Sequence, residues 1–185
     1  MNAHPRPDEQ QLIQECLAGK QAAQWQLYKK YAKAMYHTVV RMVVQPSDAE
    51  DILQDTFVKV FQKLEAFKGE STLGAWIKRI AINTALSHIQ KNGRIRFLQV
   101  QEQYDLAVPP PSFEASSMDM RSIHQAIKQL PEGCRVVFNL YLLEGYQHQE
   151  IAQILHISES TSKSQYQRAR RLLQQSLKKN LALSG

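Results

Sequence analysis

The stretch QHQEIAQILHISESTSKSQYQRARRLL, residues 147–173, has apolar side chains at helical spacing on both sides of a short polar turn. Ile151, Ile154 and Leu155 give the first half one apolar side, and a longer amphipathic segment follows Ser158. In the turn, His156 holds a position that commonly needs a positive φ, a backbone region that histidine tolerates better than most residues. The spacing therefore predicts two helices joined by a tight turn, the helix-turn-helix pattern.

The second of these helices has hydroxyl groups at its front and arginines behind them. Five of the seven residues from Ser158 to Ser164 carry a hydroxyl, and Arg168, Arg170 and Arg171 follow. Short hydroxyl side chains cap a helix and let it approach base edges closely, while arginine pairs with guanine or with phosphate. The pattern favours a helix that reads the major groove of DNA. A capped amphipathic helix with a solvated basic face is the alternative that the residues leave open.

The composition narrows the class of protein. The chain has 185 residues, of which 43% are hydrophobic, enough for one domain or two small ones with a buried core. No apolar run approaches the roughly 18 residues that a membrane span needs, and the polar N-terminal stretch lacks a signal-peptide core. Cys16 and Cys134 lie far apart, so we expect reduced structural thiols in a cytoplasmic protein.

Charge is distributed unevenly along the chain. The net charge is +6, but residues 48–65 carry five acids and two lysines. Residues 68–96 and 159–179 each carry six bases and one acid. Two basic segments, one of them preceded by an acidic segment, favour a polyanionic partner such as nucleic acid without proving one.

Helical spacing extends over almost the whole chain, and no segment shows the alternation of a strand. We therefore predict an all-α fold with two small helical domains, at 8–95 and 118–180, joined by a flexible linker at 96–117 that contains three consecutive prolines. Ser47 with Glu50 is predicted to form a capping box, and the long second helix is predicted to include Trp25 in its apolar set. The predicted helices cover about residues 8–18, 21–44, 47–66, 73–91, 131–143, 147–155 and 158–179, with a further start near 118.

The segment SDAEDILQDTFVKVF, residues 47–61, predicts a helix with a compact acidic face. Asp48, Asp51 and Asp55 fall at positions i, i+3 and i+7, with Gln54 alongside. Such a face could meet a basic protein surface, although a solvated face is the simpler interpretation. Catalysis and metal binding are not expected, because no histidine, metal-ligand pattern or glycine-rich phosphate loop accompanies the carboxylates. His148 and His156 likewise lack a third ligand, so we expect no cofactor and no enzymatic activity.

The segment STLGAWIKRIAINTALSHIQKNGR, residues 71–94, combines an apolar side with a polar stripe. Arg79, Asn83 and Ser87 are spaced four apart, and Lys91 continues the line. Trp76 and the polar loop before it add an aromatic ring, which single-stranded bases can stack on while cations neutralise the phosphates. The alternative is that Trp76 belongs to the core and the stripe is only solvated.

Together these motifs resemble a bacterial RNA polymerase sigma factor of the extracytoplasmic-function (ECF) group. SDAEDILQDTFVKVF resembles region 2.2 of that group, and FKGESTLGAWIKRIAINTALSHIQK resembles regions 2.3 and 2.4. The segment LPEGCRVVFNLYLLEGYQHQEIAQILHISESTSKSQYQRARRLL resembles region 4. The resemblance covers about residues 20–95 and 120–178, and it departs from the family at Ser87, at IQKNGR and at Gln165. These departures concern which promoter is read.

The resemblance implies a role for each surface in transcription initiation. The expected partner is core RNA polymerase, with its β and β′ subunits. The acidic helix would bind the β′ subunit. The basic helix would bind the melted −10 element as single-stranded DNA, with one base flipped into a pocket, and the helix-turn-helix would bind the −35 element as duplex. An anti-sigma factor is an expected partner, and membrane insertion is not expected.

The residues assigned to these roles fall into three groups. The polymerase group is Asp48, Asp51, Gln54 and Asp55. The −10 group is Lys68, Ser71, Thr72, Trp76, Lys78, Arg79, Asn83, Thr84, Ser87 and Lys91. The −35 group is Ser160, Thr161, Lys163, Ser164, Gln165, Arg168 and Arg171. A stand-alone helix-turn-helix regulator with a helical partner-binding domain is the rival hypothesis, and it would dimerise and bind a palindrome unaided. A DNA recombinase is less favoured, because no catalytic serine or tyrosine constellation is found.

Overall fold

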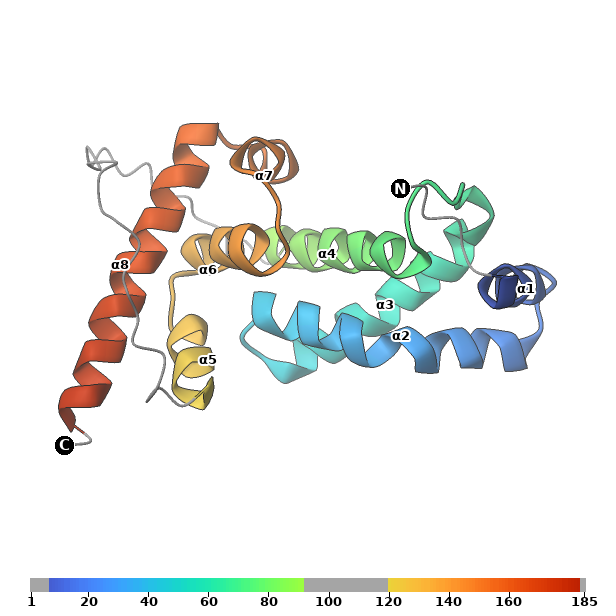
Figure 1. Cartoon of the computed structure of the whole chain (residues 1–185), viewed down its shortest axis with the longest axis horizontal. Coiled ribbons are helices and arrows are strands. Elements are labelled where there is room, and N and C mark those ends of the chain that lie inside the picture. Colours follow the sequence, from blue (N-terminus) through green and yellow to red (C-terminus); the bar gives the residue numbers. More distant parts are fainter. Residues whose placement is uncertain (1–6, 92–119, 184–185) are drawn as a thin grey trace. The chain divides into compact units, whose positions relative to one another are not determined.

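The structure is a computed structural model that describes residues 7–91 and 120–183, and every regular element in those ranges is a helix. The all-α prediction is confirmed. The chain forms two compact units, residues 1–92 and 93–185. The predicted linker, 96–117, lies outside the described residues. Figure 1 shows the course of the helices within each unit.

Within residues 7–91, the first unit contains four α-helices and a short 3₁₀ turn. They are α1 (Pro7–Leu17), α2 (Gln21–Met42), α3 (Pro46–Lys63), η1 (Leu64–Ala66) and α4 (Leu73–Lys91). The helices α2, α3 and α4 pack against one another, and α1 packs against α2 (Figure 1). Leu27, Ile52, Ile77 and Ile82 are almost completely buried where these helices meet. Burying large aliphatic side chains contributes about 1.5–3 kcal/mol each, so this core defines the unit.

Three details of the first unit differ from the predictions. Helix α3 begins at Pro46 with Gln45 at the N-cap position, so Ser47 lies inside the helix and forms no capping box. Proline suits the first helical position because its missing N–H would be unpaired there in any case. Helix α2 ends at Met42, since Val43 is already extended. Trp25 is 57% exposed and is not part of the core.

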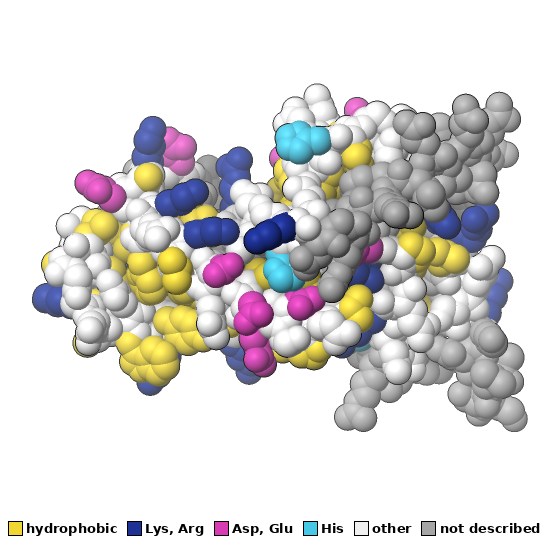
Figure 2. Space-filling model, turned by 180° about the vertical axis from the view of Figure 1, so that it is seen from behind, with side chains coloured by type: hydrophobic (Ala, Val, Ile, Leu, Met, Phe, Trp, Pro, Cys, Tyr) yellow, Lys and Arg dark blue, Asp and Glu magenta, His cyan; other side chains and the backbone are white. Residues whose placement is uncertain are grey.

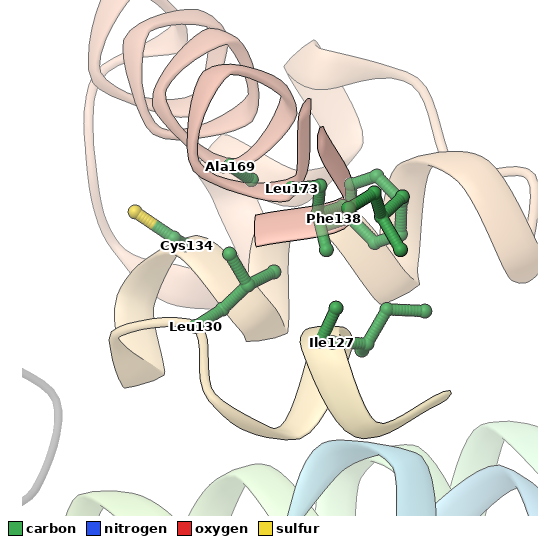
Figure 3. Close-up of a cluster of buried hydrophobic side chains, with 8 residues drawn as sticks. Ile127, Leu130, Cys134, Phe138, Ala169 and Leu173 are labelled. Atoms are coloured by element: carbon green, nitrogen blue, oxygen red, sulfur yellow. The ribbon is translucent and has the colours of Figure 1, made fainter. Parts of the chain in front are cut away.

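The second unit consists of helices packed on one long C-terminal helix. Its elements are α5 (Met120–Lys128), α6 (Glu132–Phe138), the π-helical segment η2 (Asn139–Leu143), α7 (His148–Leu155) and α8 (Glu159–Leu183). Figure 3 shows the buried cluster in which Ile127, Leu130, Cys134 and Phe138 face Ala169 and Leu173 of α8. The predicted helix over 131–143 is therefore α6 continued by a π-helical segment.

A buried arginine holds the connection between α5 and α6. The Arg135 side chain is 3% exposed and donates hydrogen bonds to the backbone carbonyls of Leu130 (2.9 Å) and Lys128 (3.3 Å). Its Nη2 also lies 3.4 Å from Glu132 Oε1. Burial lowers the pKa of the Arg135 guanidinium, and the nearby Glu132 carboxylate partly opposes this shift. The carbonyls at a helix end need such donors, so Arg135 fixes where α6 starts against α5.

Candidate nucleic-acid interface

The α7–α8 segment has the geometry predicted from residues 147–173. His156 adopts the left-handed conformation (φ 55°, ψ 45°) directly after α7, which confirms the predicted positive φ. The Ile157 N–H donates to the Ala152 carbonyl at 3.0 Å and closes the turn. Ser158 Oγ accepts the backbone N–H of Thr161 at 3.0 Å, the bond expected of an N-cap. Two helices therefore meet at a tight, capped turn.

A cluster of polar and aromatic side chains joins α7 to α8. His148 stacks on Tyr141 with ring centroids 4.2 Å apart, and its Nδ1 lies 2.9 Å from the Oγ of fully buried Ser162. The Tyr166 ring approaches His148 edge-on, with centroids 5.7 Å apart. Desolvation and the nearby Lys163 lower the pKa of His148, partly opposed by Glu159. Sequence reasoning did not find this cluster, although Ser162 lies seven residues before buried Ala169 on the same helix face.

The front of α8 presents some of the predicted −35 residues and buries one. Ser160, Lys163 and Arg171 are exposed, while Thr161, Ser164 and Arg168 are half-buried. Lys163 Nζ lies 2.7 Å from Glu159 Oε1, and this hydrogen bond lowers the pKa of Glu159. Gln165 is only 2% exposed, and its Oε1 accepts a hydrogen bond from the buried Cys134 thiol at 3.0 Å. Gln165 is four residues before Ala169, so it faces the core and not the outer surface of α8.

The solvent side of α4 carries the predicted polar stripe. Arg79, Asn83, Ser87 and Lys91 are exposed, and Lys78 is half-buried. Thr84 is 4% exposed, and its hydroxyl accepts a hydrogen bond from Lys59 Nζ at 3.2 Å. Because Thr84 is seven residues after buried Ile77, it points to the core side of α4. We therefore exclude Thr84 from the candidate surface.

The loop before α4 brings an aromatic pair next to polar side chains. The rings of Phe67 and Trp76 lie 5.3 Å apart and both residues are half-buried. Thr72 Oγ1 accepts the Ala75 N–H at 3.2 Å and caps α4, while Lys68 is exposed and Ser71 is half-buried. Gly69 has φ +72°, a conformation that favours glycine in this turn. The loop therefore places cationic, hydroxyl and aromatic groups at the start of the stripe on α4.

The outer side of α3 is acidic. Asp51, Gln54 and Asp55 are exposed, whereas Asp48 is half-buried with Oδ2 3.8 Å from His88 Nε2 of α4. Figure 2 shows a cluster of acidic side chains on the face in view, with hydrophobic and basic side chains beside it. Carboxylates exposed on one helix face are electrostatically suited to a basic partner surface.

Membrane spans and metal sites are both absent from the part of the chain that the structure describes. None of the helices between residues 7 and 91 or between 120 and 183 is long and apolar enough to cross a membrane. In the same two ranges, no three His, Cys, Asp or Glu side chains come together in a way that could hold a metal ion.

Known proteins match this chain over most of its length. The family model "Sigma-70 region 2" matches residues 27–95, and "Sigma-70, region 4" matches residues 120–173. The ECF RNA polymerase sigma-E factor of Escherichia coli K12 is 30% identical over 178 residues, 88% of this chain and 90% of that protein. The RNA polymerase sigma-H factor of Pseudomonas aeruginosa is 29% identical over 181 residues, 91% of this chain and 93% of that protein.

A solved structure is similar in fold as well as in sequence. It is the sigma factor RpoE in complex with the anti-sigma factor NepR from Bartonella quintana. The match has a TM-score of 0.55 and 27% identity, and it covers 83% of this chain and 95% of the other.

Proposed function

This chain belongs to the sigma-70 family of RNA polymerase sigma factors, in its ECF group, and from that premise we propose how its surfaces divide the work of initiation. Sigma factors bind core RNA polymerase and promoter DNA, and they start transcription at promoters. Polymerase binding, −10 binding and −35 binding are each assigned to a different helix of this chain. No catalytic step is assigned to the chain itself.

The helix α8 is proposed to read the −35 element as duplex DNA. Ser160 and Lys163 are exposed at the front of the helix, where recognition helices contact base edges. Arg171, farther along α8, is exposed and suited to a phosphate on the flank of the groove. Thr161, Ser164 and Arg168 contribute the half-buried edge of this surface. The cluster of His148, Tyr141 and Tyr166 sets the angle between α7 and α8, so it governs how α8 enters the groove.

The helix α4 and the loop before it are proposed to hold the melted −10 element. Arg79 and Asn83 form the centre of this surface, with Ser87 and Lys91 farther along and Lys78 at its edge. Lys68, Ser71, Thr72 and Trp76 supply the loop side, where an unpaired base would be held. Unstacking a base costs a few kcal/mol, which contacts to the extruded base and its phosphates must offset.

The acidic face of α3 is proposed to bind the β′ subunit of core polymerase. Asp51, Gln54 and Asp55 are its exposed members, and Asp48 is oriented by its proximity to His88. Exposed charges of this kind mainly raise the association rate and select the partner.

An anti-sigma factor is proposed as a further partner that would cover the two domains, at 8–95 and 118–180. The complex of the similar sigma factor RpoE with NepR suggests this by analogy. Because core polymerase acts on chromosomal DNA, we place this work in the cytoplasm.

The observation that carries the proposal is that separate exposed surfaces on α3, α4 and α8 carry the charges that a polymerase and two forms of DNA require. Gel filtration of the protein with and without core polymerase tests the assignment of α3. We expect a complex with core polymerase, and we expect Asp51→Asn with Asp55→Asn to weaken it roughly tenfold at low salt.

The matched control is Asp8→Asn with Glu65→Gln, which removes the same charge from exposed acids outside the face and should leave the affinity unchanged. A dimer that shifts duplex DNA without polymerase, and ignores core enzyme, would instead support the rival regulator. Equal weakening by both double variants would show that only net charge matters.

A further inference from the structure

Helix α2 has an unusual charge distribution that the proposed function does not use. Its 22 residues include no aspartate or glutamate, but they include Lys29, Lys30, Lys33 and Arg41. An exposed helix of a soluble domain usually mixes charges of both signs, since i,i+4 pairs stabilise it. A long helix with cations alone therefore produces a local positive potential.

Part of this charge is already matched within the protein, and part is not. Lys30 is matched, because its Nζ lies 2.8 Å from Glu9 Oε1 of α1. Lys29 and Lys33 are exposed, and neither forms an ion pair with any residue of 7–91 or 120–183. Two unmatched cations on one helix face are available to an external anion.

The unmatched cations lie on one stripe with an exposed tryptophan. Trp25, Lys29, Lys33 and His37 follow one another at intervals of four residues, and all four are exposed. With a rise of 1.5 Å per residue, the stripe is about 18 Å long. We call these four residues the α2 stripe. It is long enough to follow several phosphates of one strand.

Trp25 provides the stripe with a planar surface. Its ring is stacked on Tyr28 with centroids 5.4 Å apart and an interplanar angle of 7°, yet the residue is 57% exposed. Lys29 Nζ lies 5.0 Å from the centroid of the Trp25 ring. The indole is therefore supported from within and accessible from outside, and its cationic neighbour on the stripe is a flexible side chain that can move to a phosphate.

We propose that the α2 stripe is a second binding surface for single-stranded DNA, with Trp25 as a base-stacking platform and Lys29 and Lys33 as phosphate contacts. A cationic track with an exposed aromatic ring is the combination that sequence-independent single-strand binding uses. Duplex DNA could bind Lys29 and Lys33 through its phosphates, but it offers no unpaired base to stack on the indole. An acidic protein segment could also bind the two lysines, but it would leave the Trp25 ring without a contact. The inference goes beyond the proposed function, which assigns no DNA-binding role to α2.

Fluorescence anisotropy of the full-length protein with a labelled oligothymidine, over a series of NaCl concentrations, tests the proposal. For Lys29→Ala with Lys33→Ala, the magnitude of the negative slope of log K against log [salt] should fall by about 1.4, which is about 0.7 for each phosphate that the variant no longer neutralises. Trp25→Leu should weaken binding roughly tenfold with little change in slope, since stacking is not an ionic interaction.

The matched control is Lys63→Ala with Lys128→Ala, which removes two exposed cations outside the α2 stripe, and it should leave the magnitude of the slope close to that of the wild type. A slope that falls equally in both double variants would overturn the proposal, because net charge alone would then explain it. If Lys29→Ala with Lys33→Ala lost affinity for core polymerase but still bound oligothymidine like the wild type, the proposal would also be overturned, and the α2 stripe would be a protein-binding surface. Oligothymidine binding by Arg79→Ala, measured in parallel, reports the contribution of the −10 surface on α4, so the contribution of the α2 stripe can be judged independently of it.

The fluorescence of Trp25 reports stacking directly in the Trp76→Phe variant, in which Trp25 is the sole tryptophan. Oligothymidine should quench the emission of Trp25 in this variant, while an oligomer of polyglutamate at equal charge should not. Emission that stays constant as the oligonucleotide saturates the protein would contradict a stacking role for Trp25.

Discussion

Replacing Arg79 and Asn83 with alanine should impair promoter melting without impairing recognition of the −35 element. Both side chains are exposed on α4, and Arg79 has no ion pair within the described residues. Alanine is the best helix former, so the free energy of unfolding should change by less than about 0.5 kcal/mol. The variant can therefore be compared with the wild type at equal folded concentration.

The size of the effect follows from the hydrogen bonds that the two side chains can make. A charge-assisted hydrogen bond contributes about 1.5–3 kcal/mol and a neutral one about 0.5–1.5 kcal/mol. Removing one of each should cost about 2–4.5 kcal/mol of single-strand binding, which lowers the yield of open complexes roughly thirtyfold or more. The magnitude of the negative slope of log K against log [salt] on a single strand should fall by about 0.7, because without Arg79 one phosphate is no longer neutralised.

The assay needs a promoter first selected in vitro by the wild-type protein with core polymerase. Permanganate reactivity of unpaired thymines measures melting, and anisotropy on a duplex with the −35 element alone measures recognition. Gln14→Ala with Lys20→Ala is the control, since it removes one amide and one cation from exposed positions away from all proposed surfaces. Equal losses in melting and in −35 binding, or no loss in either, would refute the separation of tasks between α4 and α8.

Three further predictions concern the second unit. His156→Gly should leave the free energy of unfolding unchanged or raise it by up to about 1 kcal/mol, because glycine adopts the left-handed conformation without strain. His156→Val should lower the free energy of unfolding, and a thermal melt measures both changes. Arg135→Met should lower the free energy of unfolding by roughly 3 kcal/mol in urea, because Glu132 and two backbone carbonyls lose a buried donor; an unchanged midpoint would contradict the role of Arg135. Since the pKa of His148 is lowered on folding, the unfolded chain binds more protons, so stability should fall as the pH drops below about 6.5. His148→Gln should flatten that dependence, and an equally steep profile in both proteins would assign it to another group.

Local signals in the sequence were sufficient for the helix-turn-helix. Helical periodicity predicted residues 73–91 as a helix, and α4 has those bounds. The positive φ at His156 was predicted because His156 holds the position of the helix-turn-helix turn that commonly needs this conformation. Such features depend on a few neighbouring residues, so a single sequence contains them.

Features that depend on packing between helices were predicted less well. Motif matching placed Thr84 and Gln165 among the DNA-binding residues, but each faces a buried neighbour, which counting from Ile77 or Ala169 would have indicated. Trp25 was placed in the apolar set of the second helix but is exposed, because hydrophobicity alone does not distinguish a buried ring from an exposed one. The stacking of His148 on Tyr141 joins residues from different elements, and no sequence period reports such an arrangement.

Transcription by core polymerase on a library of random promoters, with and without this protein, tests the central claim most directly. The account predicts that transcripts start only when the protein is present, downstream of two sequence elements at a fixed separation. It also predicts that substitution of Lys163 with alanine changes the preference at the upstream element alone. Transcripts that start equally well without the protein, or selected promoters that share a single palindrome, would contradict the claim that two separate surfaces of one chain read duplex and melted DNA for the polymerase.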